Sequence, residues 1–127
     1  MRARALFVAA LFAGCGGPAR SPSAAVRALD EAARSGDTEA AFRLLGPRTR
    51  ARLEADARRA AEQAGRRSLA PSELLAAGWT TARFEIDGAS EISRNGDVAT
   101  VEIRGRRGER ARVEVVREGD VWRVELP

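Results

Sequence analysis

Hydrophobic residues recur at every third or fourth position over the first half of the chain and at every second position over the last third. The longer spacing places apolar side chains on one face of a helix, whereas alternation places them on one face of a strand. The pattern therefore predicts helices first and strands afterwards. The predicted helices cover residues 23–36, 37–45, 47–65 and 71–78.

Capping and breaking residues mark where these helices begin and end. Ser23 is placed to cap the first helix, and Gly36 follows its last apolar position. Pro47 suits the first turn of the third helix, where its missing N–H loses no partner. Gly65 is placed to end that helix in a left-handed conformation. The apolar face predicted for the third helix is narrow and rich in alanine: Leu53, Ala57, Ala60 and Ala64.

Four strands separated by turn signals are predicted after Trp79. They cover residues 81–93 with a bend at Gly88, then 98–104, 110–117 and 121–126. Asn95-Gly96 is typical of a two-residue hairpin turn, because both residues tolerate positive φ. This order predicts an α+β domain in which three to four helices pack on a four-stranded antiparallel meander. The inward-facing residues are predicted to be Ala82, Phe84, Ile86, Ala99, Val101, Ile103, Ala111, Val113, Val115, Trp122, Val124 and Leu126.

The N-terminal segment has the features of an export signal. Arg2 and Arg4 precede nine apolar residues, Ala5 to Ala13. A basic start and an apolar run of this length are typical of a signal peptide, whereas a membrane-spanning helix needs about 20 apolar residues. We therefore expect an export signal and no transmembrane anchor in this segment.

The end of the apolar run, LFAGC, resembles the lipobox of bacterial lipoproteins. Ala13 and Gly14 precede Cys15, and Phe12 stands where leucine is usual. In such signals the cysteine thiol receives a diacylglyceryl group and the chain is cut before the cysteine. A buried free thiol, an intermolecular disulfide and an ordinary signal-peptidase cut are the alternatives for Cys15.

The lipobox resemblance implies three parts for the chain. These are a signal peptide at 1–14, a lipidated cysteine with a flexible tether at 15–22, and a single α+β domain at 23–127. The protein is then expected to be exported and lipid-anchored to the bacterial envelope, at the periplasmic or the outer-membrane face. The membrane is the expected partner through Cys15, with an envelope protein as a second partner. Nucleic acid is not expected, and the oligomeric state is open, a dimer included.

The absence of histidine and tyrosine limits the chemistry open to this chain. Histidine is the usual acid–base group near neutral pH, and zinc sites rely on His and Cys. We therefore predict no catalytic residue, metal or cofactor. The remaining bases are carboxylates, of which Asp87 and Glu91 lie near the bend of the first strand. A lone carboxylate lacks the electrostatic partner that such chemistry needs, so we do not expect an enzyme.

All 22 basic residues are arginine, set against 18 acidic residues, for a formal charge of +4. In the third helix the two signs alternate at a spacing of four, as in Arg52–Asp56 and Glu62–Arg66, which predicts ion pairs along its surface. The segment RGRRGER at 104–110 holds fewer acids, so this hairpin tip is the predicted anion-contact site. The arginines of that site are Arg104, Arg106, Arg107 and Arg110. For the third helix, contact with anionic lipid headgroups, lipopolysaccharide or an acidic partner is the alternative to a solvated and internally paired face.

The order of elements and the C-terminal stretch VVREGDVWRVELP resemble the nuclear transport factor 2-like superfamily, an α+β cone. The resemblance implies an apolar pocket inside the cone, with Leu53, Trp79, Phe84 and Trp122 as its candidate lining. Catalytic members, such as ketosteroid isomerases and polyketide cyclases, use Asp with Tyr or His. Because Tyr and His are missing here, the resemblance favours a non-catalytic binding or assembly domain. A carrier or sensor of a small apolar ligand is the alternative, followed by a degenerate cyclase- or isomerase-type enzyme.

Overall fold

The computed structural model describes residues 19–78 and 85–127, which form helices followed by an antiparallel sheet. This arrangement confirms the predicted α+β class. The helices are α1 (Pro22–Ser35), α2 (Thr38–Arg43), α3 (Pro47–Gln63) and α4 (Pro71–Gly78). The strands are β1 (Ile86–Asn95), β2 (Val98–Gly105), β3 (Arg110–Glu118) and β4 (Val121–Glu125).

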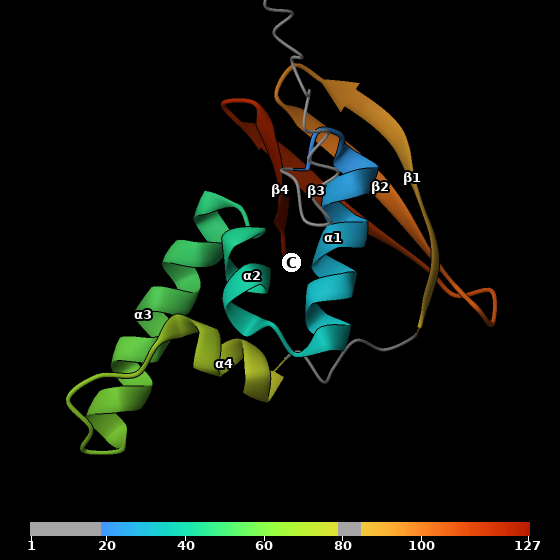
Figure 1. Ribbon diagram of the computed structural model, residues 1–127. Helices are drawn as coiled ribbons and strands as arrows, with labels where there is room; N and C mark the ends of the chain where they lie inside the picture. Colours follow the sequence, from blue (N-terminus) through green and yellow to red (C-terminus); the bar gives the residue numbers. More distant parts are fainter. Residues whose placement is uncertain (1–18, 79–84) are drawn as a thin grey trace, which may run out of the picture.

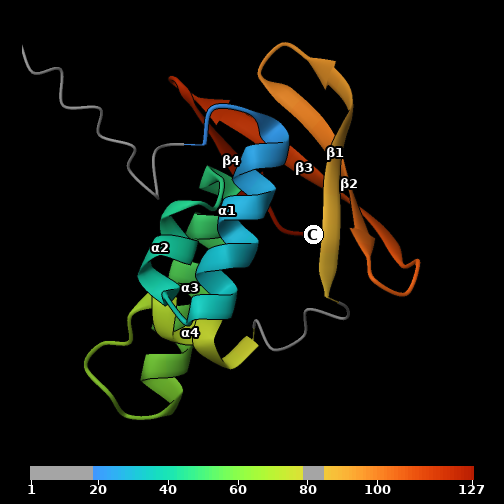
Figure 2. The same cartoon turned by 45° about the vertical axis from the view of Figure 1, so that its right-hand side comes forward.

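The helices form one layer and the four strands form the other (Figures 1 and 2). The strands pair in the order β1-β2-β3-β4, each antiparallel to its neighbour, as predicted for a meander. Helix α1 packs against all four strands, whereas α2 packs between α1 and α4. Helix α3 contacts α4 and the outer strand β4. None of the helices in the described part of the chain has the length and apolar character needed to cross a bilayer.

The core lies between α1 and the inward face of the sheet. Val101 of β2, Val115 of β3 and Val124 of β4 are almost fully buried there. Ala99, Val113 and Trp122, each two residues away on the same strands, are also buried, which confirms these inward positions. The predicted inward residues Ile103 and Ala111 are partly buried. Leu126 is partly buried but lies beyond the end of β4, and the predicted positions Ala82 and Phe84 lie outside the described residues.

The folded part begins earlier than the predicted boundary at residue 23. Ser21, rather than Ser23, caps α1, and its Oγ accepts a hydrogen bond from the Ala24 N–H at 3.2 Å. Pro22 then takes the first helical position, which its fixed φ favours. Ala19 is buried, and its carbonyl accepts the Trp122 N–H at 2.9 Å. Residues 19–22, which the sequence pattern assigns to a tether, therefore belong to the folded domain in the structure.

The buried face of α3 also differs from the prediction. Ala57 is buried and Leu53 packs partly against the core, as expected, but Ala64 is exposed. The buried stripe runs instead through Thr49, Leu53, Ala57 and Ala61, each four residues from the last. Thr49 sets this rotation of the helix, because it is bound to the end of β4, as described below.

The two edges of the sheet are protected in different ways. The edge strand β1 has register shifts between Ile86 and Gly88 and between Glu91 and Ser93. The first shift is the bend predicted at Gly88, and such bulges disfavour pairing with another chain. At the other edge, the Gly46 N–H donates to the Val124 carbonyl at 2.8 Å. The segment between α2 and α3 thus covers the β4 edge.

Candidate functional site

The β2–β3 hairpin brings two of the four predicted anion-contact arginines together. Arg104 near the end of β2 and Arg110 at the start of β3 are direct partners in the antiparallel register. On its other side, Arg104 pairs with Gly88 of β1. A Cβ atom at Gly88 would lie only 3.0 Å from Nη2 of Arg104. The guanidinium of Arg104 therefore lies close over the β1 backbone, in space that glycine leaves free.

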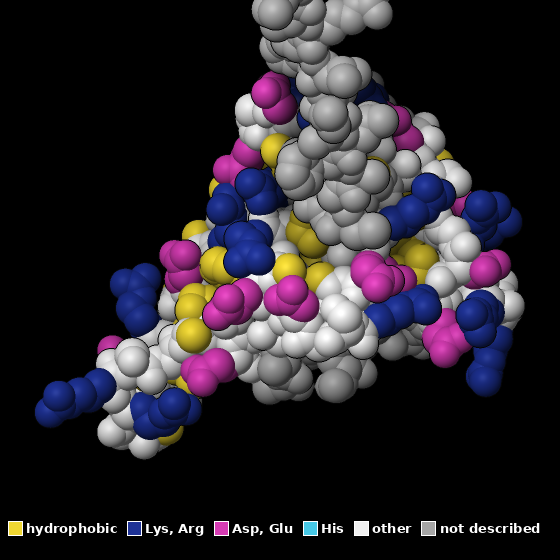
Figure 3. Space-filling view, viewed as in Figure 1, with side chains coloured by type: hydrophobic (Ala, Val, Ile, Leu, Met, Phe, Trp, Pro, Cys, Tyr) yellow, Lys and Arg dark blue, Asp and Glu magenta, His cyan; other side chains and the backbone are white. Residues whose placement is uncertain are grey.

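A polar cleft of about 250 Å³ opens at this end of the sheet. In the space-filling view, basic side chains interspersed with acidic ones project from the edge of the molecule where the β2–β3 hairpin lies (Figure 3). Arg106 and Arg107, the other two predicted arginines, are not part of the cleft wall. The wall is formed by Asp87, Gly88, Arg104, Gly105, Gly108, Glu109 and Arg110.

The hairpin arginines differ in how far carboxylates already satisfy them. Arg106 pairs with Glu85 at 3.2 Å, while Arg110 lies 3.9 Å from Glu102. Within residues 19–78 and 85–127, Arg104 has no carboxylate partner within ion-pair distance. Glu109 is engaged in the turn itself, since its Oε2 accepts the Arg107 N–H at 2.9 Å.

The predicted pocket-lining residues are only partly described. Trp79 and Phe84 lie outside the described residues, as does Cys15, and Leu53 is partly buried against the core. Trp122 is 2% exposed on the inward face of β4. The guanidinium groups of Arg94 and Arg117 lie 4.8 and 5.6 Å from its ring centroid, within the range of cation–π attraction.

Both arginines over Trp122 are also held by carboxylates. The hydrogen bond from Arg94 lowers the pKa of Glu91, one of the two carboxylates considered as a base. Arg117 binds Asp97 at 2.5 Å. These contacts close the end of the core that lies beside Ala19, and the hydrophobic pattern of the sequence does not predict them. The pairing of β3 with β4 in the last hairpin could have indicated them, because it places Arg117 opposite Trp122.

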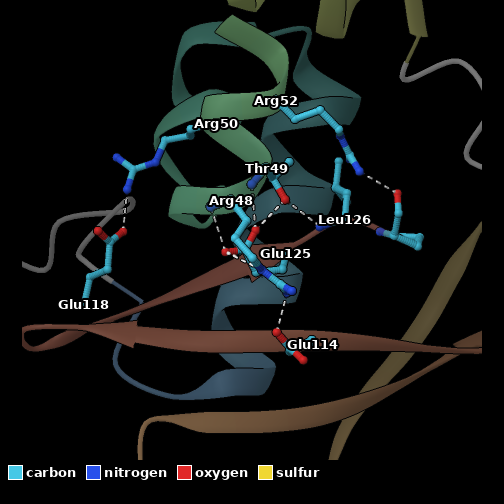
Figure 4. A network of polar contacts seen from close by, with 9 residues as sticks. Arg48, Thr49, Arg50, Arg52, Glu114, Glu118, Glu125 and Leu126 are labelled. Atoms are coloured by element: carbon cyan, nitrogen blue, oxygen red, sulfur yellow. Dashed lines mark hydrogen bonds and ion pairs between the residues drawn. The ribbon is translucent and has the colours of Figure 1, made fainter. Parts of the chain in front are cut away.

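The one glutamate or aspartate side chain classed as buried in the described chain, Glu125, lies at the start of α3 (Figure 4). It is 3% exposed, although its position between the inward-facing Val124 and Leu126 predicts an outward side chain. Its Oε1 accepts the Arg48 N–H at 3.1 Å. Its Oε2 accepts the Thr49 N–H at 2.9 Å and the Thr49 hydroxyl at 2.5 Å. Glu125 thus caps a helix that is remote in sequence.

Helix α3 has no N-cap side chain of its own, and Glu125 takes that role. The residue at the N-cap position is Gly46, which offers no side-chain oxygen to the free N–H groups of the first turn. A carboxylate at a helix N-terminus is also favoured by the helix dipole. The Thr49 hydroxyl completes the arrangement by accepting the Leu126 N–H at 2.9 Å. Glycine at the N-cap position is the sequence feature that could have indicated this, because the N–H groups of the first turn then need an acceptor from another part of the chain.

The surroundings of Glu125 keep it ionised. Burial raises the pKa of Glu125, but the hydrogen bonds from Thr49 and Arg48 outweigh burial and leave this pKa below its usual value. Both oxygens already accept hydrogen bonds from α3. The group is therefore occupied as a helix cap, and its position gives no support to a role as a general base.

Ion pairs surround this junction between α3 and the sheet. Arg48 binds Glu114 at 2.5 Å, and Arg50 binds Glu118 at 2.6 Å. Arg52 donates to the Pro127 carbonyl, so the predicted Arg52–Asp56 pair is wrong and Asp56 pairs with Arg59. The arginines of the first turn thus bind strands more than they bind their own helix. The pairs of Arg48 with Glu114 and of Arg59 with Asp56 are exposed and are each worth a fraction of a kcal/mol, whereas the Arg50–Glu118 pair is partly buried.

The comparison with protein families assigns the chain. The family described as "Domain of unknown function (DUF4878)" matches residues 13–125. The chain belongs to this family. A search of curated proteins and a search of solved structures each gave no match. In the described part of the DUF4878 chain, no cluster of three or more acidic or cysteine side chains is placed to hold a metal ion.

The Glu125 cap predicts a specific pH dependence of stability. Glu125 has a lowered pKa in the folded state, so its contribution is present above the unfolded-state pKa of about 4.3 and is lost as pH falls through the folded value. At pH 7, Glu125→Gln should lower the free energy of unfolding by about 1–3 kcal/mol. The difference from the wild type should shrink below pH 4 in urea titrations.

The matched control is Glu114→Gln. Glu114 also binds Arg48 but is far more exposed, so its loss should cost less than about 0.5 kcal/mol. Equal costs for the two variants, or a Glu125→Gln deficit that persists unchanged at pH 3, would contradict the assignment of Glu125 as an ionised cap.

Proposed function

We propose that this protein is an exported lipoprotein whose DUF4878 domain is a non-catalytic binding module held at the membrane of the bacterial envelope. The lipobox-like LFAGC at the end of a signal-like segment supports the anchor at Cys15. The occupied state of Glu125 and the exposure of Asp87 support a binding role over a catalytic one. We further propose the nuclear transport factor 2-like architecture for the domain, on the order of its elements.

The observation that carries the proposal is how closely the domain follows Cys15. Three residues separate Cys15 from Ala19, which is buried and bound to Trp122. Four steps of 3.8 Å between consecutive Cα atoms span at most about 15 Å. A lipid on Cys15 would therefore hold this end of the domain directly at the membrane surface.

The basic hairpin lies at the other end of the sheet. The start of α1 lies near the β1–β2 turn, whereas the β2–β3 hairpin extends away from it (Figures 1 and 2). Arg117, which lies opposite Trp122, is seven residues along β3 from Arg110. At about 3.3 Å per residue this separation is about 23 Å, more than the tether can span. The domain would then present its hairpin to a partner, away from the lipid that anchors it.

Lipidation is tested by the intact mass of the protein purified from membranes. The expected product has lost residues 1–14 and carries a diacylglyceryl group on Cys15, with or without a third acyl chain. Cys15→Ser should abolish both changes and leave the protein unacylated. Phe12→Leu, which restores the usual lipobox residue, should be processed at least as completely as the wild type. An unmodified Cys15 in the mature protein would refute the anchor.

Orientation is tested by spin labels at the two ends of the sheet. Cysteine is introduced by Asn95→Cys at the β1–β2 turn or by Arg107→Cys at the hairpin, in lipidated protein reconstituted into phosphatidylglycerol-containing vesicles. A nickel chelate attached to lipid headgroups should relax the label at 95 more strongly than the label at 107. Equal relaxation, or stronger relaxation at 107, would show that the hairpin lies on the membrane.

A further inference from the structure

The facing residues Arg104 and Arg110 place two positive charges on the same face of the β2–β3 hairpin. Residues directly opposite in an antiparallel pair have their side chains on the same face, with Cβ atoms about 4.5–5.5 Å apart. Like charges in such positions repel each other. Glu102 lies 3.9 Å from Arg110, which offsets only part of this repulsion. In the described part of the chain, Arg104 has no carboxylate within ion-pair distance.

The surroundings of the pair leave room for a small group. Gly88, Gly105 and Gly108 form three of the seven positions around the cleft, so bulky side chains do not fill it. The guanidinium of Arg104 lies against Gly88, and a Cβ atom there would come within 3.0 Å of its Nη2, so the arginine side chain would have to shift. The volume of about 250 Å³ suits a small polar group better than a large ligand.

From this geometry we infer that Arg104 and Arg110 together hold one oxyanion, a carboxylate or a phosphate group, in the cleft at the hairpin end of the sheet. Each guanidinium offers a planar fork of N–H donors that matches two oxygens of such a group. The anion would neutralise the facing positive charges and would bridge β2 and β3. The inference names the ligand chemistry of the proposed binding domain and in that sense rests on the proposed function.

The acidic residues of the cleft restrict the ligand. Asp87 and Glu109 also line it, and neither makes an ion pair with Arg104 or Arg110 in the described part of the chain. Their charges repel every negative group that the two arginines do not contact directly, so a ligand with one anionic group is favoured over a polyanion. A nucleic acid backbone is therefore a poor fit for this cleft. A carboxylate or phosphate presented singly by a protein, peptide or small molecule fits it.

The test is an NMR titration of the full-length, ¹⁵N-labelled protein in non-ionic detergent at constant ionic strength. The probes are N-acetylglycine, which carries a single carboxylate, and inorganic phosphate. At least one should cause saturable shifts at the amides of Gly88, Gly105 and Gly108. Arg104→Gln or Arg110→Gln should weaken this binding about tenfold, because each removes charge-assisted hydrogen bonds. The probe that saturates identifies which oxyanion the cleft prefers.

The matched control is Arg112→Gln, which removes the same charge from the same strand outside the cleft wall. It should change the affinity less than twofold. Shifts that do not saturate with either probe, or an equal loss in Arg112→Gln, would overturn the proposal, since general attraction to a basic surface would then explain the result.

Thermal unfolding supplies an independent readout. At low salt without the probe, Arg104→Gln should unfold at a higher temperature than the wild type, because the facing charges are relieved. A lower unfolding temperature would overturn the proposal by showing that Arg104 is a structural residue. The NMR titration measures anion binding to the folded domain whether or not Cys15 carries lipid. If no binding is found while the intact mass shows lipidation, the anion site is refuted and the membrane anchor still stands.

Discussion

The carboxylate of Glu125 at the start of α3 is the contact on which the docking of α3 on the sheet depends. Thr49 and Arg48 donate to it from α3, while its own backbone closes strand β4. Because α3 lacks a cap of its own, the same contact completes the helix and docks it on the sheet. The cover over the β4 edge, the buried stripe of α3 and the nearby ion pairs all lie around this contact. A buried carboxylate of this kind is costly to leave unpaired, so the helix and the strand stabilise each other.

The two ends of the sheet have different characters, and this difference underlies the proposed function. At the end beside Ala19, Trp122 is covered by Arg94 and Arg117, whose charges are matched by Glu91 and Asp97. That end is closed and electrostatically satisfied. At the hairpin end, Arg104 and Arg110 face each other beside an open cleft. A membrane anchor at the closed end would leave the unsatisfied end free for a ligand.

Periodicity and turn chemistry predicted most of the fold, because both are local. The alternation of Val113 and Val115 and the Asn95-Gly96 turn depend on neighbouring residues alone, and the strands follow them. Glu125 and Thr49 could not be paired in this way, since 76 positions separate them and alternation points Glu125 outward. The cap predicted at Ser23 is wrong because Ser21 followed by Pro22 is the stronger signal for the start of α1. For the site, the sequence indicated the arginines, but the cleft also needs Gly88 from a different hairpin.

The most direct measurement of the central claim is a double-mutant cycle between Gly46 and Glu125. A Cβ at Gly46 would lie 2.3 Å from the Glu125 carboxyl carbon, while φ −72° and ψ 167° at this position suit alanine. In the wild type, Gly46→Ala should displace the cap and lower the free energy of unfolding by about 1–3 kcal/mol. In the Glu125→Ala background, the same change should be neutral or should stabilise by up to about 1 kcal/mol, because alanine restricts the unfolded chain. Equal effects of Gly46→Ala in both backgrounds would contradict the claim that Glu125 holds α3 on the sheet.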